Sequence, residues 1–420
     1  MRDNRYLRTV PKAASHLLSW CLFATTLANP CKGLAVEQAY YDSSLQRSNF
    51  MSFSPFYEKI LEEQIKDRRS LFLWRLRFES EGMQTDQNIN SQIVGATTQG
   101  RFVYKIMDDI SFNAKVNLRL RSGRTQALFG DLEPTSGIYP REINLKWTPF
   151  KDTLILRAGQ IHQNWFNEPM FLGNLGFPGL QQTLQHSPEN GRYNVKLITQ
   201  QLIPTSATLS TRVGEREETP NLITSTLQGS YNISSQNFIT ASATHFNYSR
   251  LPRIVAFNSF LYGNSVTNND INNAEFVYDF DGFLTNITFE QKLSHSLAAQ
   301  VQWNTIQNIK APDELGEAQA IVLFIYNDFG RWIAGVTIRD YFIEGDAVPG
   351  FYNSHLLGHN NREGQRVELN LESKDWGVIF RASYTKADLL NPDRFPVIGG
   401  LQQDNQQTFY FSVETMYDFI

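Results

Sequence analysis

The sequence predicts an all-β fold, a transmembrane antiparallel up-and-down β-barrel of about 16 strands, preceded by a signal peptide and a short helix. Three observations support this prediction. Segments of about ten residues alternate apolar and polar side chains. The connections between these segments alternate between short and long. The apolar side of the segments is rich in aromatic residues.

The beginning of the 420-residue chain has the features of a secretory signal peptide. The first twelve residues include four basic side chains, and residues 13–28 are largely apolar. Gly33 and Ala35 then supply small residues before a predicted cleavage at Val36. An N-terminal anchor helix is the alternative, but the apolar run is short for a membrane span. We therefore expect residues 1–35 to be a signal peptide.

Cysteine content and charge exclude several classes of protein. Cys21 and Cys31 both precede the predicted cleavage, so we expect neither a disulfide framework nor a thiolate site in the rest of the chain. The chain has 38 basic and 42 acidic residues; residues 1–35 hold five and one of them, which leaves 33 and 41 and a net charge of −8. This acidic balance argues against a nucleic-acid partner.

The segment "ISFNAKVNLRLRSGR" at 110–124 shows the alternating pattern at its clearest. Successive side chains of a strand point to opposite faces, so this segment has one apolar and one cationic face. The same pattern recurs along the chain. We predict sixteen strands at 70–80, 99–108, 110–121, 141–149, 152–161, 178–187, 191–201, 220–232, 237–248, 274–292, 295–305, 316–327, 330–343, 364–373, 375–386 and 406–420.

Short and long connections alternate between these strands. Turn residues such as "SPENG" at 187–191 and "LSHS" at 293–296 form the short ones, whereas the long ones are polar and include "NNDINN" and "GHNNREG". Transmembrane barrels have short periplasmic turns and long outer loops. Closure of the barrel also leaves no unpaired strand edge in lipid. An even number of strands places both ends of the barrel on the periplasmic side.

One predicted strand, 274–292, changes its apolar phase partway. Phe276 and Phe280 share one phase, and Phe283 begins the other. Asp281 and Gly282 between them are either a bulge within one strand or a hairpin turn that would add a strand. We take the bulge, because an extra strand would invert every later connection.

Tryptophan positions support a lipid-facing apolar side. Five tryptophans share the apolar phase and fall near predicted strand ends, where an aromatic girdle belongs: Trp74, Trp147, Trp303, Trp332 and Trp376. The main structural alternative is a secreted multidomain β-sandwich protein, which would bury such residues in its core. We expect the apolar faces to meet outer-membrane lipid and the charged faces to meet water inside.

Several features together resemble the porins, which are 16-stranded barrels of the Gram-negative outer membrane. They are the leader, the strand count, the cysteine-free body and the terminal strand "TFYFSVETMYDFI". "INLKWTPFKDTLILRAGQIHQNWF" is weakly similar to the carbohydrate-selective porins, which also carry helical residues before the first strand; "SPFYEKILEEQIKD" would be that helix.

The resemblance implies a function and a domain organisation. It implies a periplasmic or plug segment at 36–69, a barrel at 70–420, and passive diffusion of small hydrophilic solutes or ions, with sugars as one class. Its other implied partners are outer-membrane lipid and further copies of the chain in a homotrimer.

The loop after the fifth predicted strand, "HQNWFNEPMFLGNLGFPG" at 162–179, is unusually apolar for a solvated loop. In porins this loop folds into the barrel and narrows it. The resemblance implies a pore constriction in which this loop faces inward-phase cations, and charge rings of this kind set ion preference. We assign to it Trp165, Phe166, Glu168, Phe171, Arg75, Arg77, Lys115, Arg119, Arg121 and Arg157.

Two alternatives remain open for this loop and these cations. The loop could pack as a lid on the barrel rim or on a trimer partner. The basic residues could simply solvate the lumen and pair with neighbours such as Glu79 and Glu142.

Signals for catalysis are weak. His355 and His359 in "HLLGH" have a metal-ligand spacing, but they lie in a polar loop without a helical carboxylate nearby. No G-x-S-x-G nucleophile motif occurs. We therefore expect a porin that is not an enzyme and that needs no metal or cofactor. A phospholipase-like barrel enzyme and a surface adhesin are the alternative functions.

Overall fold

In the computed structural model, every described residue belongs to the unit at residues 42–420. The other unit, residues 1–41, lies outside the described residues, as do the predicted signal peptide and the predicted helix before the first strand. The described residues are 69–86, 90–124, 136–150, 153–163, 166, 168–173, 175–188, 191–204, 217–268, 270, 272–392, 403–415 and 418–419.

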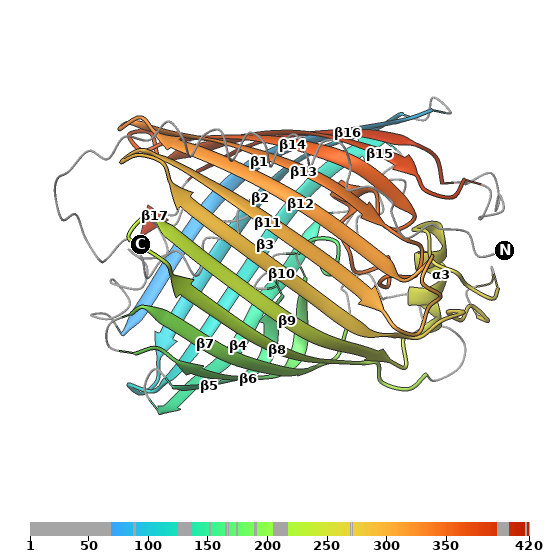
Figure 1. Ribbon diagram of the computed structural model, residues 1–420, viewed down its shortest axis with the longest axis horizontal. Helices are drawn as coiled ribbons and strands as arrows, with labels where there is room; N and C mark the ends of the chain where they lie inside the picture. The colour runs from blue at the N-terminus through green and yellow to red at the C-terminus, as the bar shows by residue number, and fades with distance from the viewer. Residues whose placement is uncertain are drawn as a thin grey trace. The chain divides into compact units, whose positions relative to one another are not determined.

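The strands form a closed antiparallel barrel (Figure 1), which confirms the predicted fold class. Each strand pairs with its neighbours in sequence, and β1 pairs with β16, which closes a ring of 16 strands. The strands are β1 (Ser70–Thr85), β2 (Asn90–Lys105), β3 (Ile110–Arg124), β4 (Gly137–Phe150), β5 (Leu154–His162), β6 (Gly176–His186), β7 (Tyr193–Leu202), β8 (Asn221–Asn232), β9 (Asn237–Ser249), β10 (Phe280–Lys292), β11 (Leu297–Asn308), β12 (Glu317–Asp328), β13 (Trp332–Ile343), β14 (Arg362–Ser373), β15 (Val378–Leu389) and β16 (Gln406–Thr415), and β17 (Asp418–Phe419) pairs with β1 beyond the end of β16.

The alternation of side chains separates an apolar outer face from a polar interior. On β1, Phe78 is 57% exposed, whereas its neighbour Glu79 is 7% exposed. On β16, Phe409 is 60% exposed and Thr408 is buried. Because an apolar surface of this extent is unstable in water and matches lipid, the exposed faces of the strands are the membrane-facing surface of the barrel.

Four of the five tryptophans lie toward the short-turn end of the barrel. Trp74 and Trp147 lie near the start of β1 and the end of β4. Trp332 begins β13 and Trp376 lies in the turn between β14 and β15, with their rings 5.4 Å apart. Trp303 differs from the prediction, because β11 is longer than expected and places this residue at mid-strand. The girdle is therefore clearest at one end.

Two local predictions were wrong. The sequence placed a long connection at 81–98, but β1 and β2 extend to Thr85 and from Asn90, because their register continues unbroken through Gly82. Residues 274–279 precede β10 rather than belonging to it, and no register shift occurs at Asp281 in either ladder of β10. The change of apolar phase thus marks the start of β10. Asp281 and Gly282 lie within one strand, as predicted, but they form no bulge.

Three long connections form an apolar cluster with inward-facing strand residues. They are L3 (163–175), L5 (250–279), which contains α3 (Arg253–Leu261), and L7 (344–361), which contains η5 (His355–Leu357). Figure 1 shows α3 at one end of the barrel and β17, which follows β16, toward the other end. Among the described residues, no helix is long and apolar enough to cross a membrane.

Candidate functional site

The interior of the barrel has two kinds of polar wall. The ionic wall consists of the inward-facing charged residues of β1–β5 and β14–β16, and the amide wall consists of the inward-facing amide and hydroxyl residues of β7–β11. The main members of the ionic wall are Arg75, Arg77, Glu79, Glu81, Lys115, Arg119, Arg121, Arg157, Arg366, Glu368, Arg381 and Glu414. The main members of the amide wall are Gln200, Thr224, Thr226, Thr244, Asn286, Thr288, Gln302 and Asn304.

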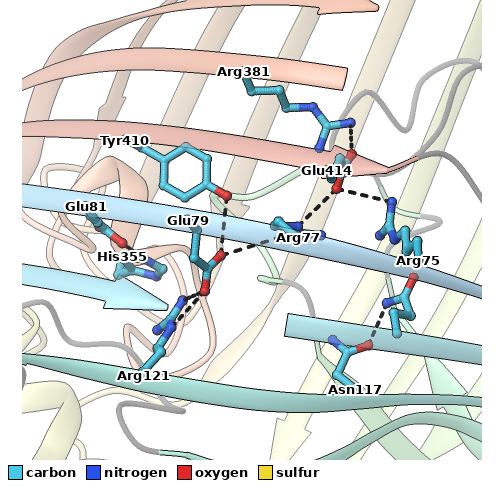
Figure 2. A network of polar contacts seen from close by, with 11 residues as sticks. Arg75, Arg77, Glu79, Glu81, Asn117, Arg121, His355, Arg381, Tyr410 and Glu414 are labelled. Atoms are coloured by element: carbon cyan, nitrogen blue, oxygen red, sulfur yellow. Dashed lines mark hydrogen bonds and ion pairs between the residues drawn. The ribbon is translucent and has the colours of Figure 1, made fainter. Parts of the chain in front are cut away.

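Glu414 is the centre of one ion-pair cluster at the junction of β1 and β16, where the ring closes. Its carboxylate oxygens lie 2.8 Å from Arg381 Nη2, 3.0 Å from Arg77 Nε and 3.4 Å from Arg75 Nη1 (Figure 2). The Glu414 side chain is fully buried. A buried carboxylate is tolerated only when charges and hydrogen bonds compensate its lost hydration, and three arginines provide that compensation.

Glu79 is the centre of a second cluster, two residues further along β1 from Arg77. Arg121 on β3 donates to Glu79 from two nitrogens, each 2.9 Å from Oε1. Arg77 Nη1 lies 3.8 Å from Oε2, and the Tyr410 hydroxyl donates to the same oxygen at 3.4 Å (Figure 2). Arg77 and Arg121 are thus paired with Glu79, as in the alternative interpretation in which the basic residues pair with neighbours.

The other predicted cations lie on the same wall but make different contacts. The Arg119 guanidinium lies 5.3 Å from the centre of the Tyr139 ring, in a cation–π contact. Arg157 Nη1 donates to Gln181 Oε1 at 2.6 Å. Lys115 is buried on β3 and faces Glu142 of β4 in the strand register. The structure therefore brings the six predicted cations to one side of the interior.

Hydrogen bonds connect the side chains of the amide wall from strand to strand. Thr224 donates to Gln200 Oε1 at 3.0 Å, and the hydroxyls of Thr226 and Thr244 lie 2.8 Å apart. A separate group connects β10 with β11. Asn304 Oδ1 accepts from Asn286 at 2.6 Å and from Gln302 at 2.9 Å. The amide nitrogens of Gln200 and Asn304 are buried, and neither has a hydrogen-bond partner among the described residues.

Two facing glycines give β5 and β6 an unusual backbone at the base of L3. Gly159 and Gly179 are cross-strand partners, with φ of 125° and 157°. A Cβ on either would lie 2.4 Å or less from a main-chain oxygen of the neighbouring strand, so no other residue fits.

The aromatic residues of L3 lie in the apolar cluster. Phe171 is fully buried, with its ring 5.0 Å from that of Phe166 and 4.9 Å from that of Phe246, which points inward from β9. L3 therefore packs against the inner face of the barrel. Phe166 and Phe171, which were both assigned to the constriction, are buried in the apolar cluster. Trp165 lies outside the described residues.

Glu168 pairs with a cation that the sequence analysis did not identify. Its Oε1 accepts from Arg339 Nη1 of β13 at 3.0 Å and from the Met170 amide at 3.0 Å. Glu168 thus neutralises Arg339 instead of facing Arg75 or Arg157 on the ionic wall. Arg339 has the inward phase of β13, so its orientation was predictable, but its partner was not.

L3 and L7 meet inside the barrel although they leave it from strands that are far apart. L3 follows β5 and L7 follows β13, eight strands later in a ring of 16. The Gly173 amide donates to Tyr352 O at 2.8 Å, and the Ser354 amide donates to Pro169 O at 2.9 Å. Two loops from opposite sides of the ring are therefore joined by main-chain hydrogen bonds.

Tyr352 fixes L7 from within the apolar cluster. Its hydroxyl donates to Pro204 O at 2.6 Å, and its ring lies 5.5 Å from that of Phe177. Burial raises the pKa of Tyr352, so the hydroxyl stays protonated and remains a donor. L7 is thus connected both to L3 and to the segment after β7.

L7 also contacts the ionic wall through His355. His355 Nε2 lies 3.3 Å and 3.4 Å from the two carboxylate oxygens of Glu81 on β1 (Figure 2). His359 instead directs Nδ1 at Gly350 O and Asn353 Oδ1, and its ring stacks on Tyr262. The two histidines of "HLLGH" therefore have separate partners. The described residues contain no group of three or more potential metal ligands.

Comparison with known proteins gives structural matches alone. No protein-family model and no curated protein matches the sequence. Vibrio cholerae OmpT, an outer membrane protein in a trimer form, matches with 11% identity and a TM-score of 0.46 over 84% of this chain and 100% of its own. Pseudomonas putida OprB matches with 8% identity and a TM-score of 0.46, over 85% and 95%. A Rhodopseudomonas blastica porin matches with 10% identity and a TM-score of 0.40, over 82% and 99%.

The membrane assignment rests on the molecule itself. The ring is closed, its outer face is apolar, its interior is polar, and tryptophans collect toward one end. A closed sheet satisfies every backbone group internally, as lipid requires. The protein is a transmembrane β-barrel, and its fold is weakly similar to that of the Gram-negative porins among these matches.

Proposed function

We propose that the protein forms a water-filled passage for passive diffusion of small hydrophilic solutes and ions across the outer membrane. The observation that supports this most directly is the ionic wall inside a closed ring of 16 strands. Rings of this size enclose more room than strand side chains can fill. Charged and amide side chains facing that room suit hydrated solutes.

The apolar cluster directs the proposed passage toward the ionic wall. The cluster contains residues of β5–β13 together with L3, α3 and L7, and among the described residues it includes none from β14–β16 or β1–β4. Solutes would therefore pass between the joined loops and the ionic wall. In this proposal L3 narrows the passage by occupying the other side of the interior, and Arg75, Arg77, Lys115, Arg119, Arg121 and Arg157 line the open side.

The ionic wall favours anions in this proposal. Arg77 and Arg121 share Glu79, and three arginines share Glu414, so carboxylates are outnumbered in both clusters. A cationic ring lowers the energy of an anion that passes it. Deleting residues 165–177 should raise conductance, since it removes the loop from the interior.

Sugars are one solute class for which the amide wall provides support. Amides and hydroxyls bond sugar hydroxyls without requiring a charge. Phe166 and Phe171 are buried in the cluster and so would not offer faces for stacking. In this proposal, recognition of sugars depends on the amide wall.

Planar-bilayer recording tests the function. Purified protein should give discrete open-channel conductance, with a reversal potential in a salt gradient that indicates anion preference; added sugars should reduce the current if they enter. Absence of conductance in a folded barrel, together with lipase activity on micelles, would support the barrel enzyme. Absence of both, with binding to cell surfaces, would support the adhesin. Crosslinking in detergent tests the proposed homotrimer.

A further inference from the structure

We propose that the contact between His355 and Glu81 sets the width of the passage, and that its strength changes as His355 gains or loses a proton. This inference rests on the proposed channel function. It identifies His355 and Glu81 as residues that determine passage size, in addition to the predicted constriction.

The position of the contact is the first argument. His355 belongs to L7, which is fixed to the apolar cluster on one side of the interior, and Glu81 belongs to β1 in the ionic wall. The space between cluster and wall is the route proposed for solutes. A side chain that reaches from L7 to β1 therefore crosses that route, and Figure 2 shows it next to the Glu79 cluster.

The anchoring of L7 is the second argument. Asn264 in L5 donates to Gly345 O at 2.8 Å and to Val348 O at 2.9 Å, and it accepts from the Gly350 amide at 2.7 Å. These bonds, together with those of Tyr352, hold the first part of L7. The main chain on either side of His355 is held as well, because the Ser354 amide donates to Pro169 O at 2.9 Å and the Tyr341 hydroxyl donates to Leu357 O at 2.8 Å. The part of L7 that can turn toward or away from Glu81 is therefore the His355 side chain.

The chemistry of the pair is the third argument. Glu81 is 4% exposed, and its carboxylate lies within 3.4 Å of the imidazole on both oxygens. A protonated imidazole makes a charge-assisted hydrogen bond to a carboxylate, which is roughly twice as strong as a neutral one. An ordinary histidine loses this proton as the pH rises through about 6.5. The contact should therefore hold at low pH and weaken as the pH rises.

The charged groups on the elements around His355 have partners of their own. On β14, Arg362 donates to Gly358 O at 3.3 Å and Ala387 O at 3.4 Å, and Arg366 pairs with Glu368 at 3.0 Å. The remaining groups are Lys386 paired with Asp388 on β15, Glu79 paired with Arg77 and Arg121, Tyr410 bonded to Glu79, and His359 bonded to Asn353. Among the residues that the structure describes, Glu81 is the carboxylate paired with the His355 ring.

Single-channel recording at pH 5 and pH 8 tests the proposal. Conductance of the unmodified protein should be lower at pH 5 than at pH 8. His355→Asn and Glu81→Gln should each lose this pH dependence and conduct at pH 5 as the unmodified protein does at pH 8. Heat-modifiable mobility on a detergent gel shows whether each variant is folded.

The outer face of the barrel provides a matched control. His245 Nε2 lies 2.8 Å from Asp281 Oδ1, with His245 opposite the exposed Phe283 on the lipid side of β9 and β10. His245→Asn removes a histidine–carboxylate pair outside the passage and should leave the pH dependence unchanged. If His355→Asn keeps the pH dependence, or if His245→Asn removes it, the proposal is wrong.

A disulfide gives an independent test that does not depend on pH. Residues 36–420 contain no cysteine, so after the predicted cleavage a Glu81→Cys, His355→Cys double variant would have a single thiol pair. Oxidation should lock conductance at a low value at both pH values, and reduction should raise it. Failure to cross-link in the folded barrel, or equal conductance before and after reduction, would overturn the proposal. Discrete but pH-independent channels would count against this inference alone, whereas absence of channels would count against the proposed function.

Discussion

The ionic wall around Glu414 and the apolar cluster around Phe171 belong to one ring of strands, but different forces hold them. At Glu414, three arginines from β1 and β15 compensate a fully buried carboxylate. At Phe171, aromatic rings from L3 and β9 pack without charge. One side of the barrel interior is thus lined by compensated charges, whereas the other side is filled by packed loops.

The two regions also differ in what they connect. The ionic pairs join β1 to β16, whose residues lie far apart in the sequence, and so they reinforce closure of the ring. The apolar cluster joins loops to strands and leaves ring closure to the main-chain ladder. Substitutions in the two regions should therefore have different consequences.

The largest effect is expected for Glu414→Ala. Three guanidinium groups would lose a shared buried partner, and breaking a buried pair in this way costs about 3–5 kcal/mol. Urea unfolding in lipid vesicles, followed by loss of the heat-modifiable band, measures this change. Asp375→Ala removes an exposed partner of Arg331 in a turn and should change stability little. Equal effects of the two substitutions would contradict a structural role for the Glu414 cluster.

A slightly smaller effect on stability is expected for Phe171→Ala. Truncation of a fully buried phenylalanine costs about 3 kcal/mol through lost contacts and the cavity that remains. Because Phe171 packs L3 against β9, we also expect larger conductance and more current noise, with ion selectivity unchanged. Bilayer recording together with the same unfolding assay checks both parts. A change in selectivity without a change in conductance would place L3 against the ionic wall instead.

The smallest effect is expected for Arg157→Gln, which removes one charge from the ionic wall. Selectivity should shift toward cations because the wall becomes less positive, while stability should change little since a glutamine still reaches Gln181. The reversal potential in a salt gradient measures the shift. Arg331→Gln removes the same charge from an exposed turn, where the side chain is 84% exposed, and should leave the reversal potential unchanged. Arg119→Gln should act in the same direction as Arg157→Gln.

Local patterns were sufficient to predict most of the fold. Each of the sixteen predicted strands overlaps one strand of the barrel, because the period of two in a segment such as 110–124 reports both the strand and its faces. The errors have local causes. The predicted connection at 81–98 belongs largely to the paired ends of β1 and β2, and Phe276 and Phe280 continued an apolar phase that belongs to the cluster inside the barrel.

The sequence by itself determined the strands, the two faces of each strand and the side of the interior on which the cations gather, since these depend on neighbours one or two residues apart. Only the tertiary structure decided the partners. Glu168 and Arg339 are 171 positions apart, and Arg77 and Glu414 are 337 apart. The alternation of apolar and polar residues determines that such side chains point inward. It does not determine which strand or loop lies opposite them. That choice depends on ring closure and on the meeting of L3 with L7, which many weak packing contacts determine together.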